Sequence, residues 1–203
     1  MNMSRPITTL LAFLACACLA LPLRAQTAPD ALIVQMSTEV IDAVKADKAI
    51  QAGDVSRIIA LVDTKVMPHV DFQRMTESAV GRNWKGATAE QQKRLQEEFK
   101  TLLVRSYAGA LTQVKDQTVH LKRMRGTPTD IEVEVQTEVR GSGEPVRLDY
   151  RLEKNAGGWK IYNVNVLGVW LVEQYRGVFN QKVSASGIDG LISWLAERNG
   201  GKS

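Results

Sequence analysis

An alternation of apolar and polar residues over 129–166 constrains this chain more than any other feature of its sequence. In 131–139 every second residue is apolar or threonine, and the residues between them are polar. Because successive side chains of a strand point to opposite faces, this pattern predicts one apolar and one charged face. The alternation resumes at 146–152 and again at 159–166, each time after a break that contains glycine. The sequence therefore predicts an antiparallel meander of consecutive strands.

Most of the remaining chain carries apolar residues at spacings of three and four, which is typical of amphipathic helices. Asp54 and Asp71 are candidate N-caps, and 88–91 fits a capping box that opens the longest predicted helix. A second capping box is predicted at 186–189, and 119–125 is predicted as the first strand, at a sheet edge. The predicted helices cover 30–49, 55–66, 72–80, 89–114, 167–183 and 188–195.

These elements predict an α+β fold in which helices cover the apolar face of an antiparallel sheet. Trp84 lies in a segment, 82–86, that is predicted to be a polar link between two helices. Spacing alone does not distinguish a filled core from an apolar cavity between sheet and helices, and the filled core is the simpler expectation. A cavity with such walls would suit a hydrophobic ligand that makes few hydrogen bonds.

Residues 1–25 are predicted to be a secretory signal peptide that takes no part in the fold. Arg5 precedes a nearly continuous apolar run over 7–23, and a small residue ends the segment. One alternative is a membrane anchor, but the apolar run is short for a membrane span. The other is lipidation at Cys16, but the residues around Cys16 match a lipidation motif poorly. The remaining chain, 26–203, holds no cysteine, so a single exported domain would depend on its apolar core.

Charge and composition exclude several classes of function. The net charge of +4 includes Arg5 and Arg24, so 26–203 carries +2. The sequence has no basic stripe with interleaved aromatic residues, so it predicts no nucleic-acid partner. His69 and His120 are the only histidines, which is too few ligands for a metal site. We find neither a glycine-rich phosphate loop nor a serine in a nucleophile elbow. The sequence therefore predicts no catalytic and no metal-binding residues.

Carboxylates on the charged face are the remaining candidates for acid–base chemistry. Glu132, Glu134 and Glu138 share that face at strand spacing, but a solvated sheet face explains them without any activity. Asp149 lies between two arginines, which predicts exposed cross-strand ion pairs.

Several short motifs occur in order along the chain. They are PHVDF at 68–72, GRNW at 81–84, TAEQ at 88–91, PVRLDY at 145–150, GWKIYNV at 158–164, GV at 168–169, YR at 175–176 and GIDGLI at 187–192. Each motif is weak by itself, but together they span most of the chain after the leader. Their number and order resemble those of the MlaC family.

This resemblance implies a fold and a function that spacing does not show. The fold would be a curved antiparallel sheet of the NTF2-like kind with helices packed over it. The protein would be a periplasmic phospholipid carrier and the auxiliary component of an ABC transporter, not an enzyme, and it would need no cofactor. Its partners would be an inner-membrane MCE-domain transporter complex and an outer-membrane lipoprotein complex, and its role would be outer-membrane lipid asymmetry.

On this interpretation the acyl chains would lie between sheet and helices, with the head group near the mouth. Arg74, Arg82 and Lys160 could touch the phosphate, although a solvated surface charge is the simpler interpretation of each. The predicted lipid-binding residues are Phe72, Met75, Phe99, Leu103, Tyr107, Val133, Val135, Leu148, Tyr150, Leu152, Tyr162, Val164 and Val169.

Two alternatives remain open from the sequence. One is a small enzyme on the same scaffold that acts on a hydrophobic substrate, because a fold does not fix a function. It would need an ionisable group, such as Asp149 or His120, inside the cavity. The other is a scaffold protein without lipid, for which a filled core is expected.

Overall fold

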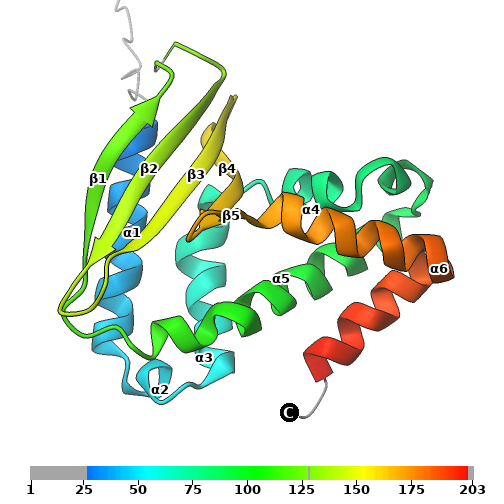
Figure 1. Ribbon diagram of the computed structural model, residues 1–203, viewed down its shortest axis with the longest axis horizontal. Coiled ribbons are helices and arrows are strands. Elements are labelled where there is room, and N and C mark those ends of the chain that lie inside the picture. The colour runs from blue at the N-terminus through cyan, green and yellow to red at the C-terminus, as the bar shows by residue number, and fades with distance from the viewer. Residues whose placement is uncertain (1–26, 128, 201–203) are drawn as a thin grey trace, which may run out of the picture.

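The computed structural model describes residues 27–127 and 129–200, so the predicted signal peptide lies outside the described residues. Figure 1 shows a twisted sheet with α1 behind it and, to one side, a group of helices formed by α4, α5 and α6. The helical elements are α1 (Pro29–Ala46), α2 (Lys48–Gln51), α3 (Val55–Leu61), η1 (Val62–Val66), η2 (Met67–His69), α4 (Phe72–Val80), η3 (Gly81–Gly86), α5 (Ala89–Leu111) and α6 (Leu171–Gly200). The strands are β1 (Thr118–Arg125), β2 (Glu132–Arg140), β3 (Val146–Asn155), β4 (Gly158–Val166) and β5 (Val169–Trp170).

The strands form one antiparallel sheet in the order β1-β2-β3-β4-β5, which confirms the predicted meander. Strand β5 is not among the predicted strands. The sequence predicts a helix from residue 167 onward, and that prediction is wrong. Leu167 and Gly168 both have positive φ, 53° and 94°, and turn the chain back so that Val169 pairs with Val166. Helix α6 therefore begins only at Leu171.

A bulge in β4 decides which side chains share the apolar face near the helices. Arg151 pairs with Asn163 while Leu152 pairs with Ile161, so Tyr162 is the extra residue. Beyond the bulge, Val164 stands opposite Tyr150 and shares its face. The sheet thus keeps one apolar face along its length although the simple alternation of β4 is broken.

Three helix starts follow their predicted capping chemistry, and at α3 the Asp54 carboxylate accepts from the backbone N–H of Arg57 at 3.1 Å. The Asp71 carboxylate accepts a hydrogen bond from the backbone N–H of Arg74 at 2.9 Å and begins α4. At α5 the Gln91 N–H donates to the Thr88 hydroxyl at 3.2 Å, and the Gln91 side chain accepts from the Thr88 N–H at 2.9 Å. This is the predicted capping box, and it is confirmed.

The second predicted capping box, at 186–189, is wrong. The Ser186 hydroxyl donates backward to the carbonyl of Lys182 at 3.1 Å, and Gly187 adopts a φ of 70°. Asp189 instead accepts a hydrogen bond from the Gln91 side chain at 2.7 Å. Residues 186 and 187 therefore form a kink that divides α6 into two helical segments.

The predicted helix over 55–66 also ends differently. Helix α3 stops at Leu61, η1 follows as a π-helical turn, and Pro68 lies inside the 3-10 helix η2 rather than beyond the helical segment. The expected polar link around Trp84 is wrong as well, since this side chain is only 5% exposed and packs in the helical core from η3.

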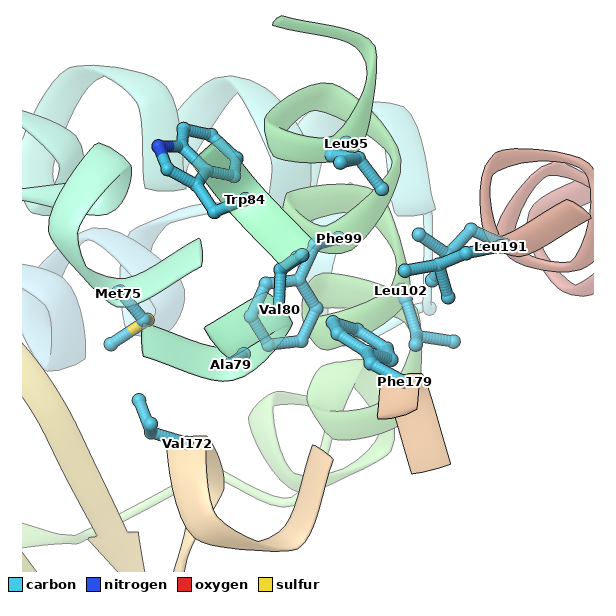
Figure 2. Close-up of a cluster of buried hydrophobic side chains, with 11 residues drawn as sticks. Met75, Ala79, Val80, Trp84, Leu95, Phe99, Leu102, Val172, Phe179 and Leu191 are labelled. Atoms are coloured by element: carbon cyan, nitrogen blue, oxygen red, sulfur yellow. The ribbon is translucent and has the colours of Figure 1, made fainter. Parts of the chain in front are cut away.

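Buried apolar residues form separate clusters in the described part of the chain. The cluster between the sheet and α1, here called the sheet cluster, comprises Ile33, Met36, Val133, Val135, Tyr150, Leu152, Trp159 and Ile161. The cluster among α4, η3, α5 and α6, here called the helix cluster, comprises Met75, Ala79, Val80, Trp84, Leu95, Phe99, Leu102, Val172, Phe179, Leu191 and Leu195 (Figure 2). A further cluster joins α1, α3 and α5 at Val44, Ile50, Ile58, Leu61, Val104 and Ala108.

Candidate functional site

The predicted sheet wall of the site is brought together on one face. Val133, Val135, Tyr150 and Leu152 are buried members of the sheet cluster. Leu148 is partly buried and packs against the same cluster. Helix α1 forms the opposite side of this cluster through Ile33 and Met36, which were not among the predicted site residues. Their spacing of three residues on a predicted helix was the available signal.

The predicted helical wall assembles elsewhere, in the helix cluster. Met75 and Phe99 are buried there, and Phe72 and Leu103 are partly buried against it. Tyr107 is half-buried, and burial raises the pKa of its hydroxyl, with a further rise from the neighbouring Tyr175. Apart from Tyr107, which belongs to neither cluster, the sequence-predicted residues of the two walls therefore belong to two cores rather than to one.

Val164 of β4 links the two cores. It is partly buried, and it is the one partly buried residue that packs against both the helix cluster and the sheet cluster in the described chain. Its place follows from the bulge at Tyr162, which returns Val164 to the face of Tyr150. Other partly buried apolar side chains pack against one cluster each: Phe72, Leu103 and Tyr175 against the helix cluster, and Leu148 against the sheet cluster.

The space between the walls is filled by side chains in this conformation. Val135, Leu152 and Phe99 are each 0% exposed, so no water-sized space touches them. Two hollows, of about 590 and 280 Å³, lie elsewhere in the described residues. The larger is bordered by the start of α5 and by Asp189, and the smaller by His69, Trp159 and Lys160.

Tyr162 and Val169, both predicted to line the site, lie outside these clusters. The Tyr162 ring lies 3.7 Å from the guanidinium carbon of Arg74, and its hydroxyl donates to Glu132 at 3.2 Å. Val169 is 47% exposed beside the β4–β5 turn. The bulge turns the first away from the apolar face, and the second follows the turn at Leu167 and Gly168 and lies at the surface.

Arg74 joins α4 to the charged face of the sheet. Its guanidinium forms an ion pair with Glu132 at 2.6 Å and a second ion pair with Glu153. Both carboxylates and the stacked Tyr162 therefore compete with any lipid phosphate for this arginine. Lys160, another residue considered for the phosphate, donates to the carbonyl of Pro68 at 2.5 Å.

The Arg74 network predicts a pH dependence of stability. The hydrogen bond from Arg74 lowers the pKa of Glu132 below its usual value in the folded protein. The stabilisation is therefore complete above the unfolded pKa, about 4.3, and is lost as the pH falls through the lower folded pKa. We expect the Arg74→Met variant to lose less unfolding free energy on acidification than the wild type.

Urea unfolding between about pH 3 and 6 measures this difference. Arg123→Met is the matched control, because Arg123 is an exposed arginine of β1. Parallel pH profiles for the wild type and Arg74→Met would contradict the expectation.

The charged face of the sheet is more buried than its sequence predicts. Asp149 is 2% exposed and pairs with Arg147 along its own strand at 3.0 Å, so the predicted exposed cross-strand pair is wrong. The Asn163 side chain accepts from the Val172 N–H at 3.1 Å and donates to Glu173 at 2.7 Å. The start of α6 covers this end of the face, which alternation along a strand does not reveal.

The structure assembles no metal constellation among residues 27–127 and 129–200. No group of three or more potential metal ligands occurs there. His120 is exposed and hydrogen-bonded to Thr118 at 3.0 Å. Within the same ranges, no helix has the length and hydropathy required to cross a membrane.

An antiparallel five-stranded sheet, curved and packed with helices, defines the chain as an α+β protein. The family model described as "MlaC protein" matches residues 34–197, and the chain belongs to the MlaC family.

Individual relatives agree with this assignment. The chain is 25% identical over 181 residues to the intermembrane phospholipid transport system binding protein MlaC of Haemophilus influenzae, a match that covers 85% of this chain and 83% of that protein. It is 29% identical over 173 residues to the toluene tolerance protein ttg2D of Pseudomonas putida, covering 83% and 79% of the two chains.

A solved structure shares the fold. It is the phospholipid-binding protein of Ralstonia solanacearum in complex with a phospholipid, with a TM-score of 0.81 and 43% sequence identity. The match covers 84% of this chain and 96% of that chain. The predicted fold class is therefore confirmed.

Proposed function

We propose that this protein is a periplasmic phospholipid carrier whose site is the junction between the sheet cluster and the helix cluster. The observation that carries the proposal is the meeting of two apolar cores at Val164, beside partly covered apolar side chains. The phospholipid bound by the Ralstonia solanacearum protein, at 43% identity, supports the same ligand here. Acyl chains would lie between the walls, with the head group toward solvent.

The separation of the two cores suits such a site. Each cluster has its own buried members, so the walls can part at Val164 without disrupting either core. The residues that would move, such as Phe72, Leu103 and Leu148, are already partly uncovered. An acyl chain would then replace contacts between side chains with contacts of the same apolar kind.

A carrier is needed because acyl chains cross water poorly. Exposing a methylene group costs about 0.8 kcal/mol, and a phospholipid carries dozens of them. We propose that this protein moves its lipid between an inner-membrane MCE-domain transporter complex and an outer-membrane lipoprotein complex. The predicted signal peptide, 1–25, and the absence of cysteine from 26–203 are consistent with export to the periplasm.

We propose that this site binds lipid and has no catalytic activity. An enzyme on the same scaffold would need a carboxylate or a histidine facing the apolar interior. Asp149 is buried but pairs with Arg147, and its neighbour Tyr150 occupies the apolar face. His120 is exposed on β1.

Native mass spectrometry of gently purified protein tests the proposal. We expect a species heavier than the polypeptide by the mass of one phospholipid, which is lost on denaturation. A polypeptide mass without adduct, under every gentle condition and after incubation with phospholipid vesicles, would contradict the proposed function.

A further inference from the structure

Aromatic rings close the helical side of the proposed lipid site in two rows. Phe72 of α4 and Tyr175 of α6 form an outer row, and both are partly buried at the edge of the helix cluster. Their ring centroids lie 5.7 and 5.0 Å from that of Phe99, which is 0% exposed. Phe179, also 0% exposed, lies 5.0 Å from Phe99 and completes the inner row.

Phe99 is the centre of this group. It contacts the rings of Phe72, Tyr175 and Phe179, and the last two meet it edge-on, at interplanar angles of 70° and 75°. Such edge-to-face contacts are favourable and fix the ring in place. Figure 2 shows Phe99 in the middle of the helix cluster, with Val80 and Phe179 beside its ring.

The helix cluster also contains aliphatic side chains that are fully buried. Leu95, Leu191 and Leu195 are each 0% exposed, so no free volume adjoins them. A group that enters from the Val164 junction can displace the partly covered outer rings, but the inner row has nowhere to move. Phe99, which is fully buried and contacts both outer rings, is therefore where a group that displaced those rings would be stopped.

We propose that Phe99 sets the length of the acyl chain that the site accepts, which makes it a specificity-determining residue. This inference rests on the proposed lipid carrier function. A chain that enters beside Val164 and displaces Phe72 would bring its terminal methyl group against the Phe99 ring. A chain that is too short leaves a void and a chain that is too long overpacks the site, and both are unfavourable.

Substitution of Phe99 tests this directly. Phe99→Leu removes volume where the acyl chain would end, so the phospholipids that copurify from one expression host are expected to carry longer acyl chains on average. Phe99→Met leaves about the same volume as Phe99→Leu but is flexible, and we expect it to broaden the range of chain lengths. Leu195→Ala is the matched control, because it opens space in the same cluster beyond an intact Phe99.

The readout is acyl composition by mass spectrometry of lipid extracted from folded, monodisperse protein. A longer average chain for Phe99→Leu, or a broader range for Phe99→Met, with Leu195→Ala unchanged, supports the inference. The inference would be overturned if the Phe99 variants that fold bind lipid with the acyl composition of the wild type. It would also be overturned if Leu195→Ala shifted the acyl composition equally. Wild-type protein without any phospholipid would instead contradict the proposed carrier function.

Discussion

Val164→Glu is expected to abolish copurification of phospholipid, with a loss of at least about tenfold in lipid occupancy. The side chain lies where the sheet cluster meets the helix cluster, so a carboxylate there would be buried among acyl chains. Burial of an unpaired charge costs several kcal/mol, which exceeds the binding contribution of a few methylenes. Lipid extraction followed by phosphate assay measures the occupancy.

Ile131→Glu is the control for this variant. Ile131 is 73% exposed just before β2, so the same change of charge leaves the junction intact and lipid occupancy unaltered. Circular dichroism and thermal unfolding confirm that each variant is folded, and Leu148→Glu provides a second test at a less central position. Full occupancy in folded Val164→Glu would show that the lipid lies elsewhere.

Trp84→Ala is expected to lower the free energy of unfolding by about 3–5 kcal/mol. Trp84 is 5% exposed and packs in the helix cluster, and its backbone carbonyl accepts from the Gln92 side chain at 3.1 Å. Removal of a buried indole leaves a cavity that the short η3 helix cannot close without losing its own contacts. Equilibrium unfolding in urea measures the change.

Trp170→Ala is the matched comparison for Trp84→Ala. Trp170 is partly buried on β5, and its ring lies 3.9 Å from the guanidinium carbon of Arg151. We expect a loss of only about 1 kcal/mol from this cation–π contact. Similar losses in the two variants would contradict the burial of Trp84.

The sequence predicted the sheet well because its signal is local. Alternation fixes the faces of β2 and β3, and polar residues that cap helices leave a short-range mark, as at Asp71 and Thr88. The same locality explains what was missed. Strand β5 has two residues, too few for any period, and it depends on the turn at Leu167.

Burial by distant elements leaves no such local mark. Asp149 belongs to the charged face by alternation and Asn163 reaches it after the bulge, opposite Arg151, yet both are 2% exposed. The Asn163 side chain accepts a hydrogen bond from Val172 in α6, nine residues away. Trp84 similarly stands among polar neighbours and is buried by helices that follow it in the sequence.

For the candidate site, the sequence identified apolar residues of both walls without showing how they divide. Tyr150 and Phe99 were predicted to line one cavity, but they belong to different cores that meet at Val164. The bulge at Tyr162 decides this arrangement, and a bulge inserts one residue without changing the composition of the strand. Tyr175 lies in a predicted helix, but it was not predicted to be part of the site.

A crystal structure of the lipid-loaded protein would test the proposed site most directly. We predict acyl-chain density between the sheet cluster and the helix cluster, in contact with Val164 and Leu148, with the outer ring of Phe72 displaced and Phe99 in place. Acyl-chain density in the surface hollow beside Asp189 and the start of α5, with the two clusters still packed together, would contradict it.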